Sequence, residues 1–206
     1  MLLPSFYPIL DSESLAKKRL SAIAATHAVL DGGARILQFR HKSFWTQSLF
    51  DEVQQIAALC RAYGALFVVN DRADLARLTG AALHVGQEDL SPSSARLVLG
   101  KDAIVGLSTH NESQLRLAAL EPTDYLAFGP IFETSSKQNP DPVVGLDELK
   151  RIRHLTTRPM VAIGGITRRN ARGVLEAGAD SVAVIGDLYP DDGDFNKRTR
   201  EWLKIL

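Results

Sequence analysis

The stretch LFVVNDRADLARLTGAALHVGQEDL, residues 66–90, decides the fold. Residues 66–69 form a short apolar run that is typical of a buried strand. Apolar residues at helical spacing follow over 72–78, and residues 81–85 form a second short apolar run. A change from strand to helix to strand within about 25 residues indicates a βαβ crossover. Such crossovers are right-handed, so the two strands are parallel and their carboxyl ends lie at one edge of the sheet.

This topology brings two aspartates together. Asp71 follows the first strand and Asp89 follows the second, so we expect both carboxylates at neighbouring strand tips. Two carboxylates in one cleft repel each other unless a cation lies between them, and Mg²⁺ prefers oxygen ligands of this kind. The pattern therefore predicts a magnesium site. A structural alternative stays open, in which Asp71 begins a helix and Asp89 stabilises a turn.

Composition points to one ordinary globular domain over residues 1–206. Lys plus Arg and Asp plus Glu both number 24, so no global field favours a nucleic acid or a membrane surface as partner. The single cysteine, Cys60, falls in a helical pattern and suits a reducing cytoplasm. No apolar run approaches ~18 residues, and no signal peptide is recognisable at the N-terminus. We expect a cytoplasmic enzyme.

The rest of the chain repeats the same alternation. Strands are predicted near residues 6–10, 35–40, 66–69, 81–85, 104–108, 125–128, 160–163 and 181–185, with a helix after each; the first helix is expected over 14–30. Eight such units predict a (β/α)₈ TIM barrel, in which chemistry lies at the carboxyl ends of the strands. A doubly wound open sheet is the alternative, but no Gly-x-Gly-x-x-Gly follows the first strand.

Basic residues follow the second strand. In QFRHK, residues 38–42, alternation places Gln38, Arg40 and Lys42 on one side and Phe39 on the other. A guanidinium beside an ammonium suits an anion with several oxygens, such as diphosphate. The alternative is a pair of basic surface residues.

Other predicted strand tips carry neutral polar groups and glycines. Ser108 could hydrogen-bond a heteroaromatic ligand, and His110 is either an acid–base group or a structural hydrogen-bonding residue. The irregular segment 129–144 contains Thr134, Ser135, Ser136 and Lys137, a pattern typical of a loop that closes on a ligand. Glycines 164–165 after the seventh strand let backbone N–H groups approach an anion, as barrels frequently do for phosphate.

In seven segments the chain resembles the thiamine phosphate synthase family, over nearly its whole length. They are QFRHK (38–42), VVND (68–71), HVGQEDL (84–90), GLSTH (106–110), GPIFETSSK (129–137), AIGGIT (162–167) and AGADSVAVIG (177–186). The resemblance implies a Mg²⁺-dependent (β/α)₈ transferase. Such an enzyme joins a hydroxymethylpyrimidine diphosphate to a thiazole phosphate, making thiamine phosphate and releasing diphosphate.

The resemblance also implies roles for individual residues. The pyrimidine diphosphate would be bound by Gln38, Arg40, Lys42, Asn70 and Lys137, with Phe39 and His41 also among the substrate-binding residues and Ser108 on the pyrimidine. The thiazole phosphate would be bound by Thr134, Ser135, Ser136, Gly165, Ile185 and Gly186. Asp71 and Asp89 would hold Mg²⁺. Arg40, Lys42 and Lys137 would act in catalysis by neutralising the leaving diphosphate.

Three positions depart from the family pattern. His41 and Ser43 stand where acidic residues are more usual, and Gly186 stands where a serine is usual. Two other functions stay open. A thiazole tautomerase-like isomerase on the same barrel would need an acid–base residue such as His110 but not the basic cluster or the metal carboxylates. A non-catalytic sensor of phosphorylated metabolites would not need the metal. Assembly into a homo-oligomer also stays open.

Overall fold

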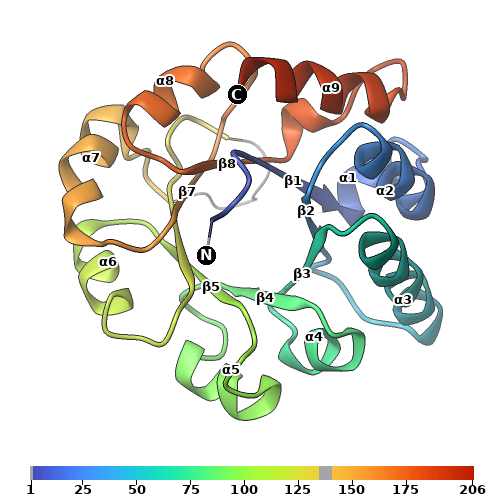
Figure 1. Cartoon of the computed structure of the whole chain (residues 1–206), viewed down its shortest axis with the longest axis horizontal. Helices are drawn as coiled ribbons and strands as arrows, with labels where there is room; N and C mark the ends of the chain where they lie inside the picture. The colour runs from blue at the N-terminus through green and yellow to red at the C-terminus, as the bar shows by residue number, and fades with distance from the viewer. Residues whose placement is uncertain (1, 135–140) are drawn as a thin grey trace.

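The computed structural model describes residues 2–134 and 141–206, and Figure 1 shows a central barrel ringed by helices. Eight parallel strands close in sequence order, each paired with its neighbours and β1 paired with β8. The strands are β1 (Phe6–Asp11), β2 (Ile36–Arg40), β3 (Leu66–Asn70), β4 (Ala82–Val85), β5 (Val105–Thr109), β6 (Tyr125–Phe128), β7 (Met160–Ile163) and β8 (Ser181–Val184). The predicted (β/α)₈ barrel is confirmed.

Helices cover the outside of the barrel. They are α1 (Ser12–Lys17), α2 (Ala22–Asp31), α3 (Gln47–Ala62), α4 (Ala73–Thr79), α5 (Pro92–Leu99), α6 (Glu112–Ala118), α7 (Gly145–Ile152), α8 (Ala171–Glu176) and α9 (Phe195–Ile205), with short 3₁₀ turns η1 (Arg153–Leu155) and η2 (Gly186–Leu188). Among the described residues, none of these is both long and apolar enough to cross a bilayer.

The single helix expected over residues 14–30 is wrong, because the chain forms two helices there. Asp11 caps α1 by accepting a hydrogen bond from the Ser14 amide, and α1 ends at Lys17. Arg19 then adopts a left-handed φ of 54°, which interrupts the helical path. Ser21 begins α2 by accepting from the Ala24 amide, so local capping overrides the apolar periodicity.

Alternation along the strands builds two apolar layers. One layer fills the barrel interior and includes Tyr7, Ile9, Val68 and Tyr125. The other lies between the strands and the helices and is much larger. Since both layers are buried, the barrel is a packed support, and ligands in this fold bind at the carboxyl ends of the strands.

The opposite end of the barrel is tied by two matching ion pairs. Asp124 Oδ2 accepts from the Val105 amide at 2.7 Å and from Arg96 at 2.8 Å. Asp180 Oδ2 accepts in the same way from the Met160 amide at 2.7 Å and from Arg153 at 3.1 Å. Each aspartate therefore fixes the amino-terminal end of a strand, on the face of the barrel that in this fold serves stability.

Candidate active site

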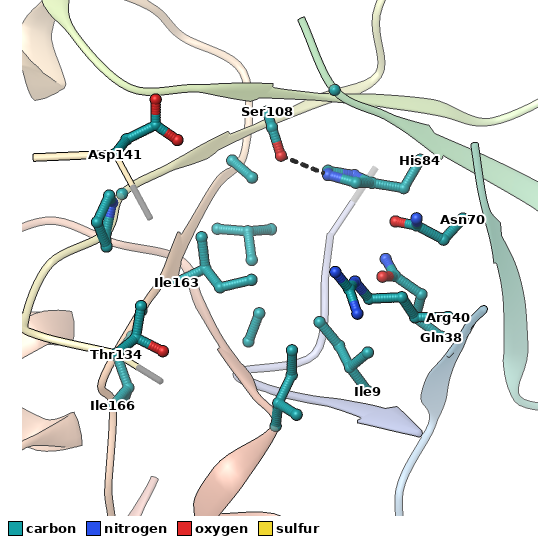
Figure 2. A pocket seen from close by; sticks show the side chains of 18 of the residues that line it. Ile9, Gln38, Arg40, Asn70, His84, Ser108, Thr134, Asp141, Ile163 and Ile166 are labelled. Carbon is teal, nitrogen blue, oxygen red and sulfur yellow. Dashed lines mark hydrogen bonds between the residues drawn. The ribbon is translucent and has the colours of Figure 1, made fainter. Parts of the chain in front are cut away.

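A cavity of about 900 Å³ opens at the carboxyl ends of the strands. All eight strands contribute inward-facing residues to it: Tyr7, Ile9, Gln38, Arg40, Asn70, His84, Ser108, Ala127, Val161, Ile163 and Ala183. In Figure 2, Gln38, Arg40, Asn70 and His84 lie together on one side, while Thr134, Asp141 and Ile166 lie across from them. The cavity therefore has a strongly polar side, formed by β2 to β4, and a second side formed by β6, β7 and their loops.

Arg40 is held by an aspartate on the neighbouring strand. Asp11 and Arg40 are register partners on β1 and β2, and their side chains form a largely buried ion pair with 2.5 Å between Nη1 and Oδ2. Asp11 Oδ1 accepts from the amide and hydroxyl of Ser14, so both carboxylate oxygens are engaged. The Tyr189 hydroxyl accepts from the Asp11 amide at 2.6 Å. Arg40 thus projects into the cavity from a fixed anchor.

Lys42 and the two predicted metal carboxylates form one cluster. Lys42 Nζ lies 2.5 Å from Asp71 Oδ2, and the Asp89 carboxyl lies close enough to that of Asp71 to raise its pKa. Burial raises the pKa of the Asp71 carboxyl; the Lys42 ammonium opposes that shift, and the neighbouring Asp89 adds to it. In this cluster the Lys42 ammonium forms an ion pair with Asp71, and Asp89 is the second carboxylate.

The backbone turns sharply at Asp71, directly after β3. Asp71 has a left-handed φ of 65°, which aspartate tolerates better than most residues. Its amide donates to the His84 carbonyl at 2.8 Å, which fixes the turn against β4. The N-cap of α4 is Arg72, so Asp71 does not begin that helix. Asp89 does stabilise its turn, because Oδ2 accepts from the Gly86 amide at 2.7 Å.

The Asp71–Asp89 pair fits Mg²⁺ by its chemistry. Within the described part of the chain, no three histidine, cysteine or acidic side chains converge to hold a metal by themselves. Mg²⁺ in enzymes usually takes one or two carboxylates, several waters and substrate phosphate oxygens. Two adjacent carboxylates at the rim of an open cavity match that pattern.

The opposite side of the cavity is a glycine cradle, formed by Gly164, Gly165 and Gly186. Gly164 and Gly165 have φ values of 101° and 61°, a region that favours glycine. A Cβ at Gly165 would lie 2.3 Å from the Glu133 carbonyl oxygen, so the loop after β6 approaches the glycine backbone closely. A Cβ at Gly186, in contrast, would meet nothing within 4 Å. The cradle is therefore tight at one end and open at the other.

Several predicted residues lie in the cavity wall and others do not. Gln38, Arg40, Lys42, Asn70, Asp71, Asp89, Ser108, Thr134, Gly165, Ile185 and Gly186 all line it. The prediction that Phe39 binds substrate is wrong. Its side chain is 1% exposed and packs in the layer between strands and helices, because alternation directs it outward. His41 is not among the lining residues; it contacts Ser12, the Phe44 carbonyl and the Trp45 ring. Ser135, Ser136 and Lys137 lie outside the described residues.

His110 lines the cavity and is tied to its wall. His110 Nδ1 lies 2.6 Å from the Gly129 carbonyl oxygen, and since a carbonyl only accepts, Nδ1 carries a hydrogen. Nε2 lies 3.5 Å from a carboxylate oxygen of Asp141. The ring therefore joins β5 to the loop after β6, as the structural alternative predicts.

Sequence patterns missed several residues in and around the site, and four of them organise it through hydrogen bonds. Asp11 orients Arg40. Three buried side chains are hydrogen-bonded in series: Tyr7 and His84, which line the cavity, and Tyr125, which lies between them. All four occupy inward positions or tips of strands, so alternation could have marked them. Their partners depend on the stagger between strands, which the sequence pattern does not give.

A (β/α)₈ barrel with cations and acidic residues on one side of its mouth and a glycine cradle on the other is typical of enzymes that act on phosphorylated small molecules. The chain belongs to the thiamine monophosphate synthase family, whose profile matches residues 6–188. A thiamine-phosphate synthase of Koribacter versatilis is 47% identical over 99% of this chain and 96% of the relative. One from Chlorobium limicola is 43% identical over 80% of this chain and 79% of the relative. The solved thiamine phosphate pyrophosphorylase of Pyrococcus furiosus superposes with a TM-score of 0.84 at 32% identity, covering 98% of this chain and 94% of that one.

Proposed function

We propose that this enzyme joins a hydroxymethylpyrimidine diphosphate to a thiazole phosphate, forming thiamine phosphate and releasing diphosphate. The observation that supports the proposal is that one cavity has basic and acidic side chains on one side and a glycine cradle on the other. Arg40 and Lys42, with the Asp71–Asp89 pair beside them, lie on one side, and the glycine cradle lies on the other. A diphosphate that leaves needs charge neutralisation, whereas a phosphate that is only held is served by backbone amides.

On the polar side, the protein's task is to stabilise the diphosphate as it departs. The C–O bond between the pyrimidine methylene and the diphosphate breaks, and both bonding electrons leave with the diphosphate. Arg40 and Lys42 stand where that charge develops, and stabilisation aimed at developing charge is usually the largest catalytic contribution. Mg²⁺, held by Asp71 and Asp89, would supply further neutralisation of the phosphate oxygens. Lys137 is assigned to the same task from the sequence alone.

The new bond needs no protein nucleophile. The 4-amino group of the pyrimidine donates electrons toward the exocyclic carbon as the diphosphate leaves. The thiazole nitrogen then supplies the electron pair of the C–N bond and becomes the positively charged ring nitrogen of the product. That nitrogen carries no proton to remove, so no general base is required. In this assignment Gln38, Asn70 and Ser108 orient the pyrimidine side of the reaction.

The second substrate is assigned to the glycine cradle. Gly165, Ile185 and Gly186 would meet its phosphate through backbone groups, with Thr134 adding a hydroxyl from the loop after β6. Ser135 and Ser136 are added to this set from the sequence alone. The serine that the family usually has in place of Gly186 is missing, so backbone contacts carry more of the phosphate binding here.

The cellular compartment and the domain organisation belong to the same proposal. The one cysteine, Cys60, is buried, and burial raises the pKa of its thiol to about 12, which suits an inert core residue in a reducing cytoplasm. One closed barrel with a continuous outer apolar layer supports a single catalytic domain over residues 1–206.

The test is incubation of the purified protein with both substrates and Mg²⁺, with diphosphate measured by a coupled pyrophosphatase assay. We expect diphosphate and thiamine phosphate in equal amounts, and neither when one substrate is omitted. Conversion of the thiazole phosphate alone to a tautomer would favour the isomerase. Tight binding of either substrate without any turnover would favour the sensor.

A further inference from the structure

A series of hydrogen bonds crosses the floor of the cavity. Gln38 Nε2 donates to the Tyr7 hydroxyl at 2.9 Å, and the hydroxyls of Tyr7 and Tyr125 lie 3.0 Å apart. The Tyr125 hydroxyl lies 3.0 Å from His84 Nδ1, and His84 Nε2 lies 2.9 Å from the Ser108 hydroxyl. Figure 2 shows the last of these contacts as a dashed line. Two residues that line the cavity, Gln38 and Ser108, are thus joined through three side chains that the proposed reaction does not use.

The packing around Tyr125 shows that this series is built into the fold. A Cβ at Gly106 would lie 2.1 Å from Cζ of Tyr125, so only glycine leaves room for the phenol ring across β5. The ring stacks on His84 with 5.5 Å between centroids and 21° between planes. Tyr125 is fully buried and Tyr7 is 1% exposed. Burial raises the pKa of both phenols, so both hydroxyls keep their hydrogens.

Counting hydrogens gives the series one direction. The Tyr7 oxygen accepts from Gln38, so the single Tyr7 hydrogen is available for Tyr125. The Tyr125 hydrogen then goes to His84 Nδ1, which places the ring hydrogen on Nε2 and directs it at the Ser108 oxygen. In the reverse direction the Tyr7 oxygen would receive two hydrogens, and its own hydrogen would have no acceptor among the described residues. The Ser108 hydrogen is therefore left to point into the cavity.

We infer that Tyr7, Tyr125 and His84 form a positioning relay that makes Ser108 a hydrogen-bond donor toward the ligand. The group that Ser108 recognises is then a heteroaromatic ring nitrogen with a free lone pair, and an amino group at that position is disfavoured. Gln38, at the other end of the relay, lines the same cavity and presents an amide oxygen that accepts from an exocyclic amine. An aminopyrimidine carries both features. The identity of this ligand rests on the proposed function, whereas the direction of the relay does not.

The first measurement needs no variant and no ligand. The ¹⁵N shifts of the His84 ring report which nitrogen carries hydrogen, and we expect the Nε2–H tautomer in the unliganded protein. Tyr125→Phe removes the hydroxyl that donates to Nδ1, so the two tautomers should then be mixed. Tyr63→Phe is the matched control, because Tyr63 pairs with His27 outside the cavity, at 3.3 Å. A pure Nδ1–H tautomer in the unaltered protein would overturn the relay.

The second measurement is calorimetric binding of the hydroxymethylpyrimidine without its diphosphate. Tyr125→Phe should weaken binding about tenfold in the unaltered background, and far less when Ser108→Ala is also present, because the relay acts through that hydroxyl. Tyr63→Phe should change nothing. Equal losses in the two backgrounds would overturn the coupling. The protein could show the Nε2–H tautomer and yet neither bind this pyrimidine nor release diphosphate. That result would support the relay direction but overturn the ligand assignment and the proposed function.

Discussion

Lys42 Nζ lies 2.5 Å from Asp71 Oδ2, so the lysine assigned to the diphosphate and a carboxylate assigned to the metal are paired with each other before any ligand binds. Arg40 is paired with Asp11 in the same way. The two described cations of the polar side, Arg40 and Lys42, are thus each paired with and held by a neighbouring acid. Binding of Mg²⁺ at Asp71 and Asp89 would loosen the hold on Lys42 and make its charge available to the diphosphate.

The metal assignment predicts the behaviour of Asp89→Asn. The amide oxygen of asparagine can still accept from the Gly86 amide, so the turn and the stability should be kept, while the charge is lost. We expect turnover to fall roughly 10²-fold or more and the Mg²⁺ concentration for half-maximal activity to rise, as for loss of one preorganised electrostatic contact. Chelation should abolish the activity of the unaltered enzyme, and added Mg²⁺ should restore it. Unchanged metal dependence in Asp89→Asn would remove Asp89 from the site.

The Asp11–Arg40 pair predicts a double-mutant result. Both side chains are largely buried, so Asp11→Ala leaves an uncompensated guanidinium and should lower the free energy of unfolding by about 3–5 kcal/mol. Adding Arg40→Ala should recover part of that loss, because no unpaired charge is then buried. Denaturant titrations of the single and double variants measure both quantities. Additive losses would show that the two side chains do not stabilise the fold as a pair.

The glycine cradle predicts opposite outcomes for two serine substitutions. Gly186→Ser has open space for the side chain and an ordinary backbone conformation, so the fold should tolerate it. Its hydroxyl should lower the KM for the thiazole phosphate about tenfold, the effect of one hydrogen bond to a charged group. Gly165→Ser would collide with the loop after β6 and should reduce both stability and activity. Unchanged kinetics for Gly186→Ser, with intact stability, would move the phosphate away from this turn.

His110→Ala separates the transferase from the isomerase. His110 joins β5 to the Gly129 carbonyl, so its loss should cost about tenfold or less in coupling activity through looser positioning. A general acid–base residue would cost about 10²–10⁴. Steady-state rates with both substrates decide between these ranges. A loss in the larger range would assign a proton transfer to His110.

Much of the fold followed from local patterns. The run of residues 66–90 gave β3, α4 and β4 because its apolar spacing changes sharply at Asn70 and again at Ala81. Apolar periodicity does not predict a helix boundary that is set by a capping residue. Ser21 begins a new helix inside a stretch whose periodicity predicts a single helix. The polar tips, Arg40 and Asp71 among them, were predictable because parallel strands present their carboxyl ends together.

The rest of the site depends on geometry that alternation does not encode. Phe39 is an exception: alternation predicted its outward orientation correctly, and only its assignment to the substrate from the family motif is wrong. The contact of Tyr125 with Tyr7 joins residues 118 positions apart and requires the stagger of a closed barrel. The sequence shows a glycine at position 106, but only the structure shows why: the Tyr125 ring occupies the space that a Cβ would need.

The central claim is that the two sides of one cavity bind two different phosphorylated substrates. A crystal structure with diphosphate, thiazole phosphate and Mn²⁺ in place of Mg²⁺ tests it most directly, because Mn²⁺ is located by its anomalous signal. We expect the metal between the carboxylates of Asp71 and Asp89, the diphosphate against Arg40 and Lys42, and the thiazole phosphate at Gly165 and Gly186. Diphosphate in the glycine cradle, or a metal bound away from both aspartates, would contradict the claim.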